Sequence, residues 1–166
     1  MTQPIRSLAE ISEAVDAAYQ SRFSPNFHFV SRKRALQKYA PVLSALEQSF
    51  RLTDTTDEND DVSIVLALDA VGASWTLYLS MVGSFAGLVE WRGSSARLVD
   101  DLSAGPDPLR ASILEVLERE GVAIVRGSIL FEPFPIRLGD GEPGHHTVFR
   151  VLFSDIDPLP ASASGS

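Results

Sequence analysis

Three apolar segments separated by glycine-containing turns constrain the fold of residues 62–92. The segments 62–71, 75–82 and 85–92 are rich in β-branched and aromatic residues. Short turns at 72–74 and 83–84 divide them, a pattern that predicts a three-stranded antiparallel meander. A further short strand is expected at 96–99. No helix should occur within residues 62–82.

The middle segment predicts how the meander is buried, because successive side chains of a strand point to opposite faces. Its odd-numbered residues, Trp75 to Met81, are large and apolar. Its even-numbered residues include Thr76, Tyr78 and Ser80. We therefore expect one face of the sheet to pack on a core and the other, semi-polar face to be accessible to a partner.

Helices are predicted before the meander. Ser7 and Glu10 form a capping-box pattern, in which each side chain accepts a hydrogen bond from the other residue's backbone amide, and a helix over 8–22 follows. Apolar residues then recur at helical spacing over 36–50, and Pro41 should kink this helix or begin a new segment.

The chain after the meander predicts one more helix and a C-terminal hairpin. Asp107 and Pro108 are suited to begin a helix, and Gly121 to end it. Short strands are expected at 122–125 and 128–131, and a last strand at 145–154. The fold class is α+β: N-terminal helices, an antiparallel meander, one further helix packed on the sheet and a C-terminal β-hairpin. Residues 1–158 are expected to form one domain, and 159–166 a disordered tail.

Composition excludes several classes of function. The chain of 166 residues has no cysteine, so thiol nucleophiles, disulfides and thiolate metal sites are excluded. Its net charge of −8 disfavours binding to nucleic acid. No segment has the roughly 20 uncharged apolar residues that a membrane-spanning helix needs. These features favour a soluble, cytoplasmic protein without membrane association.

Two sequence patterns resemble cofactor or metal sites, but their chemistry argues against both. Residues 139–144 match the glycine spacing of a dinucleotide-binding loop. However, Pro143 removes an amide, and Asp140 and Glu142 would repel phosphate. His145 and His146 are adjacent on an expected strand, so they should point apart and not share a metal. The sequence therefore predicts no cofactor, no metal and no catalytic residues, and a protein that is not an enzyme.

The acidic segment between residues 54 and 61 is the main candidate for function. It holds five carboxylates in eight residues. One interpretation is a flexible, solvated linker, and the other is a docking surface for a basic protein, since dense charge accelerates association with an oppositely charged partner. Exposed aromatic residues of the semi-polar sheet face would then serve as anchors. The candidate partner-binding residues are Asp54, Asp57, Glu58, Asp60, Asp61, Tyr78 and Trp91.

The order of elements, the acidic charge and the segments 88–92 and 147–155 resemble those of bacterial immunity proteins from polymorphic-toxin and contact-dependent inhibition systems. The resemblance concerns the overall pattern and assigns no role to any residue. It implies a cytoplasmic inhibitor that binds a cognate, basic toxin domain, which is in some systems a nuclease.

Two alternatives remain open at this point. Secretion-type chaperones are also small, acidic α+β proteins, and they bind an extended segment of a client. The third possibility is a small-ligand-binding protein or enzyme, with its site enclosed by Trp75, Trp91 and a concave sheet face.

Overall fold

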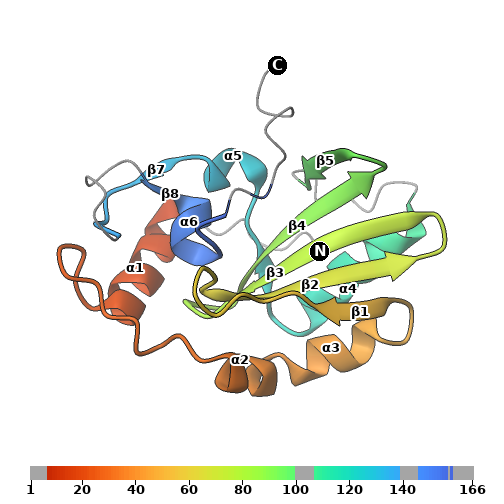
Figure 1. Ribbon diagram of the computed structural model, residues 1–166, viewed down its shortest axis with the longest axis horizontal. Helices are drawn as coiled ribbons and strands as arrows, with labels where there is room; N and C mark the ends of the chain where they lie inside the picture. The colour runs from red at the N-terminus through yellow and green to blue at the C-terminus, as the bar shows by residue number, and fades with distance from the viewer. Residues whose placement is uncertain (1–6, 100–106, 139–145, 157, 159–166) are drawn as a thin grey trace.

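The computed structural model describes residues 7–99, 107–138, 146–156 and 158, and its fold is α+β (Figure 1). The main sheet has the strand order β1-β2-β3-β4-β5, with β6 paired in parallel to β4, and β7 pairs with β8 in a small second sheet. The strands are β1 (Arg51–Asp54), β2 (Ser63–Ala70), β3 (Ala73–Ser80), β4 (Phe85–Arg92), β5 (Ser95–Leu98), β6 (Ala123–Ile124), β7 (Pro133–Phe134) and β8 (His146–Thr147). The helices are α1 (Leu8–Tyr19), α2 (Arg32–Lys38), α3 (Ala40–Leu46), α4 (Pro108–Arg119), α5 (Gly127–Leu130) and α6 (Val148–Leu152).

The predicted meander is confirmed. Strands β2, β3 and β4 pair antiparallel, and β5 extends them as expected. Ala70 and Ala73 are partners across the first turn, which leaves Val71 and Gly72 as its two central residues. Gly72 has a φ of +78°, a backbone conformation that glycine adopts without steric cost.

The predicted starts of α1 and α4 agree with the structure. However, α1 ends at Tyr19 and not at residue 22, and the helical segment expected over 36–50 spans 32–46. Ser7 and Glu10 form both hydrogen bonds of the capping box at the start of α1. The helix expected over 36–50 is divided into α2 and α3, and Pro41 lies in the first turn of α3. Asp107 caps α4 by accepting hydrogen bonds from the amides of Leu109 and Arg110. Each boundary follows from local backbone chemistry alone.

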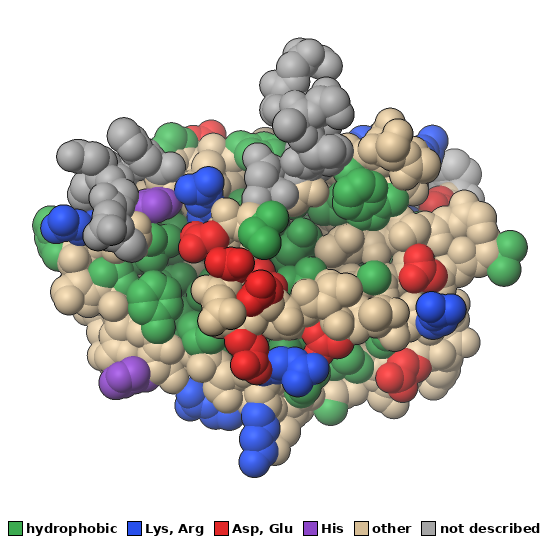
Figure 2. Space-filling model, in the orientation of Figure 1, with side chains coloured by type: hydrophobic (Ala, Val, Ile, Leu, Met, Phe, Trp, Pro, Cys, Tyr) green, Lys and Arg blue, Asp and Glu red, His purple; other side chains and the backbone are tan. Residues whose placement is uncertain are grey.

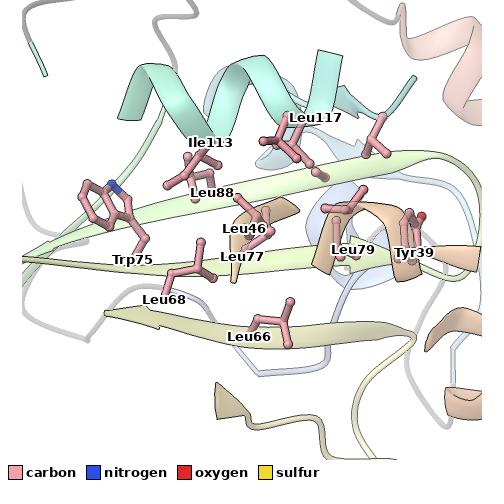
Figure 3. Close-up of a cluster of buried hydrophobic side chains, with 14 of the residues drawn as sticks. Tyr39, Leu46, Leu66, Leu68, Trp75, Leu77, Leu79, Leu88, Ile113 and Leu117 are labelled. Atoms are coloured by element: carbon pink, nitrogen blue, oxygen red, sulfur yellow. The ribbon is translucent and has the colours of Figure 1, made fainter. Parts of the chain in front are cut away.

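Both faces of the sheet are covered, so the expected semi-polar, accessible face is wrong. Helices α2, α3 and α4 pack on one face, where the side chains labelled in Figure 3 interlock between helices and strands. Helices α1 and α6 pack on the other, together with the segment around β7. Tyr78 and Val82, which were expected on the accessible face, are buried there. Strand β2 has only one exposed residue, Asp69.

Three segments differ from the expected elements. Residues 128–131, expected as a strand, lie largely in α5. The strand expected over 145–154 is replaced, within its described part, by β8 and then α6, so the C-terminal hairpin consists of β7 and β8 alone. Thr147 caps α6, and four of its residues are buried: Val148, Phe149, Val151 and Leu152. These four residues are one, three and four positions apart, which places them on one face of a helix. Burial of that face favours a helix over a strand. The start of the expected acidic loop forms β1.

Candidate functional site

The acidic loop between β1 and β2 contains a hydrogen-bonded turn. The carbonyl of Asp57 accepts hydrogen bonds from the amides of Asp60 and Asp61. The carboxylate of Asp61 accepts hydrogen bonds from the amide of Asp57 at 2.7 Å and from the hydroxyl of Ser154 at 2.5 Å. Asp61 is only 6% exposed. Its carboxylate therefore fixes the loop and cannot serve as a freely accessible charge.

The C-terminal segment runs beside the acidic loop and adds a carboxylate to it. The amide of Val62 donates to the carbonyl of Phe153 at 2.9 Å, and the amide of Asp155 donates to the carbonyl of Asp60 at 3.0 Å. Asp61 and Ser154 form the antiparallel bridge between these hydrogen bonds. Asp155 is thereby positioned next to Asp60, although the two residues are far apart in the sequence.

A hollow of about 470 Å³ lies between this loop and the segment that joins α1 to α2. Acidic side chains gather near the centre of the face shown in Figure 2, beside a larger group of hydrophobic side chains. The hollow is lined by apolar residues (Tyr19, Phe27, Val30, Val62 and Leu138), acidic residues (Glu58, Asp60, Asp61 and Asp155), Asn59 and Arg150.

The aromatic wall of the hollow is held in place by α1. The ring of Tyr19 packs edge-on against Phe27, with centroids 5.5 Å apart. The hydroxyl of Tyr19 donates to the carbonyl of Val151 at 2.7 Å, and burial raises the pKa of this hydroxyl well above its ordinary value. Phe27 is nevertheless 48% exposed. A fixed, half-exposed aromatic ring is the kind of side chain that anchors protein partners.

The carboxylates of the hollow divide into one buried group and three accessible ones. Burial raises the pKa of Asp61, and hydrogen bonds from Ser154 and from the Asp57 amide partly oppose this effect. The carboxylates of Glu58, Asp60 and Asp155 have no hydrogen bond or ion pair to any residue that the structure describes. They remain available to a cation from outside the protein.

Two of the predicted partner-binding acids have structural roles. Asp54 forms an ion pair with Arg32 at 2.7 Å and accepts a hydrogen bond from the amide of Thr56. Partial burial raises the pKa of Asp54, but these contacts outweigh it and the net shift is downward. Asp57 accepts a hydrogen bond from the amide of Asn59. Each carboxylate accepts a hydrogen bond from the backbone amide two residues further along the acidic loop.

The two predicted aromatic anchors do not belong to the hollow. Tyr78 is 9% exposed and packs against Phe149 at 5.1 Å, so it is a core residue and the prediction of an accessible anchor is wrong. Trp91 is half-buried, and its indole nitrogen donates to Thr76. It pairs with Ser74, at the end of the sheet opposite the acidic loop.

A ligand site enclosed by both tryptophans is also wrong. Trp75 is fully buried and lies in the hydrophobic core on one face of the sheet. Trp91 lies on the other face, packed against the second core cluster. Strand geometry explains the separation, because Trp91 pairs with Ser74, the neighbour of Trp75, and adjacent residues face opposite ways.

The glycine-rich segment 139–144 and His145 lie outside the described residues. His146 is buried, and its Nε2 atom accepts a hydrogen bond from the amide of Leu138 at 3.4 Å. In the part of the chain that the structure describes, no three histidine or acidic side chains are grouped as a metal site would require. The helices of these described residues are too short or too polar to span a membrane.

Comparison of the chain with models of protein families, with curated proteins and with solved structures found no match.

Proposed function

We propose that the protein is a bacterial immunity protein, which binds a cognate basic toxin domain in the cytoplasm and neutralises it. The observation that carries this proposal is the combination in one hollow of three accessible carboxylates, Glu58, Asp60 and Asp155, with the half-exposed ring of Phe27. Charged groups accelerate association with an oppositely charged partner, whereas aromatic anchors provide most of the affinity. The hollow provides both charged groups and an aromatic anchor.

The order already present in the hollow supports tight binding. Hydrogen bonds fix the acidic turn and the C-terminal segment, and α1 fixes the aromatic wall. A partner therefore does not have to order these groups, which reduces the entropic cost of binding. If the toxin is a nuclease, the carboxylates would lie where its groove otherwise binds phosphates.

The test is a charge-neutralised variant, Glu58→Gln with Asp60→Asn and Asp155→Asn. The binding partner in this test is the basic toxin domain that the proposal expects to be encoded beside this gene. We expect association at low salt to be slower by about tenfold or more, and the difference to shrink at high salt. Stopped-flow kinetics measures the rates, and rescue of growth on co-expression with the toxin measures neutralisation.

The matched control removes three exposed carboxylates elsewhere: Glu47→Gln, Asp69→Asn and Glu115→Gln. Both variants have the same net charge. Equal association rates for the two variants would show that total charge, and not the hollow, directs binding, and would contradict the proposal.

A further inference from the structure

The lining of the hollow is chemically suited to a cationic side chain with a flat, apolar face. Its four carboxylates and one guanidinium give the lining a net charge of −3. Its remaining wall is mainly apolar, and Phe27 is the exposed aromatic residue within it. A purely apolar segment would leave the carboxylates poorly solvated, and a purely charged one would leave the aromatic wall uncovered.

A guanidinium group matches this arrangement better than an ammonium group. It is planar, stacks on aromatic rings and donates two parallel hydrogen bonds to carboxylates, whereas an ammonium group is compact and strongly hydrated. The backbones of Asp60 and Asp155 are hydrogen-bonded to each other, so two accessible carboxylates arise from neighbouring positions at the rim. Arg150 also lines the hollow, and its positive charge favours an approach from the side of the acidic turn.

We infer that the hollow binds an arginine side chain from a basic segment of the partner, with the guanidinium stacked on Phe27 and paired with the carboxylates of Asp60 and Asp155. This inference rests on the proposed function, because it identifies the chemical group through which the toxin domain is recognised. Arginine is among the residues that most often dominate protein interfaces, and an acidic, aromatic-walled hollow gives it a specific place to bind.

Three capped tripeptides provide the probe: acetyl-Gly-X-Gly-amide, where X is arginine, lysine or citrulline. Each is titrated into the full protein, and NMR follows the backbone amides of residues 57–62 and the ring of Phe27. We expect the arginine peptide to bind about threefold more tightly than the lysine peptide, because of ring stacking. The citrulline peptide keeps the planar shape but lacks the charge, so it should bind at least about tenfold more weakly.

Two variants separate stacking from charge. Phe27→Leu keeps an apolar side chain but removes the ring, and it should abolish the preference for arginine over lysine. Asp60→Asn with Asp155→Asn should weaken both cationic peptides to a similar degree. Because Phe27, Asp60 and Asp155 are surface side chains, a one-dimensional spectrum confirms that each variant is folded.

Equal binding of the arginine and lysine peptides, or the absence of shifts at residues 57–62, would overturn the inference. So would an arginine preference that survives in Phe27→Leu. A different result would contradict the proposed function. In that case, the neutralised variant would associate with the toxin domain as rapidly as its matched control, even if the arginine peptide still bound in the hollow.

Discussion

Asp61 illustrates how one carboxylate of an acidic segment can differ from its neighbours. It is buried and accepts two hydrogen bonds, whereas Glu58 and Asp60 lie at the rim of the hollow. Burial makes ionisation of Asp61 less favourable in the folded protein than in the unfolded chain, and the charges of Asp57 and Asp60 add to this effect. The contribution of Asp61 to the free energy of unfolding therefore depends on pH.

The raised pKa of Asp61 predicts the direction of this dependence. As pH rises above the ordinary aspartate value of 3.8, the unfolded chain loses its proton before the folded protein does. The folded state binds the proton more tightly, so the contribution of Asp61 to the free energy of unfolding falls as pH rises through its folded pKa. Asp61→Asn removes this decline.

Urea unfolding at a series of pH values from about 3.5 to 7 measures the effect. The free energy of unfolding of Asp61→Asn, minus that of the parent, should increase with pH across the window above 3.8. Asp69→Asn controls for the loss of one carboxylate on an exposed position of β2. A constant difference for Asp61→Asn would contradict the assigned shift.

The sequence predicted an acidic loop before β2, but neither its hydrogen-bonded turn nor the separate roles of its carboxylates. Composition made all five acids equivalent, whereas Asp61 is distinguished by its burial and by its contact with Ser154, which is far away in the sequence. Asp155 was missed for the same reason. Phe27 belongs to a segment rich in phenylalanine, a visible signal, but its exposure depends on how α1 packs.

Among the elements, those with local signals were predictable. The capping box of α1, the proline within the first turn of α3 and the glycine turn after β2 are determined by residues close in sequence. The burial of both sheet faces was also predictable from the sequence, because β2 is a nearly continuous apolar segment. A strand that is buried on one face only would alternate apolar and polar residues. The sequence of β3 concealed this, since the polar residues Thr76 and Ser80 alternate with apolar ones although Ser80 is fully buried.

The side chain of Asp107 stabilises the start of helix α4. The Asp107 carboxylate accepts hydrogen bonds from two amides of the first turn, at 2.9 and 3.3 Å. Asp107→Ala should lower the free energy of unfolding by about 1 kcal/mol. In a domain of this size, that corresponds to a decrease of about 2–4 °C in Tm. Thermal denaturation followed by circular dichroism measures it.

Glu115→Ala is the control, because this residue is exposed on the same helix and should change stability by less than about 0.5 kcal/mol. An equal decrease in Tm for both variants would mean that the cap contributes nothing beyond an exposed carboxylate.

The buried side chains of the described residues form two hydrophobic clusters that share one sheet. Leu77 belongs to the cluster beneath α2, α3 and α4, and Phe153 to the cluster beneath α1 and α6. Because the strands form a wall of both clusters, we expect them to unfold in one cooperative transition. Leu77→Ala should lower the free energy of unfolding by about 2–5 kcal/mol, and Phe153→Ala by about 3–5 kcal/mol.

Circular dichroism and tryptophan fluorescence, recorded on the same urea series, provide the measurement. The two signals should give coincident curves for the parent and for both variants. A separate early transition in Phe153→Ala, seen by only one of the two probes, would show that the layer of α1 and α6 unfolds on its own.

The hydrogen bonds between the acidic turn and the C-terminal segment have a consequence for biosynthesis. A ribosome releases the chain from its N-terminus, so the acidic turn emerges long before residues 153–155. Until those residues are added, the Asp60 carbonyl, the Asp61 carboxylate and the Val62 amide lack their hydrogen-bond partners in the C-terminal segment. The lining of the hollow is therefore complete only when the chain has been translated through Asp155.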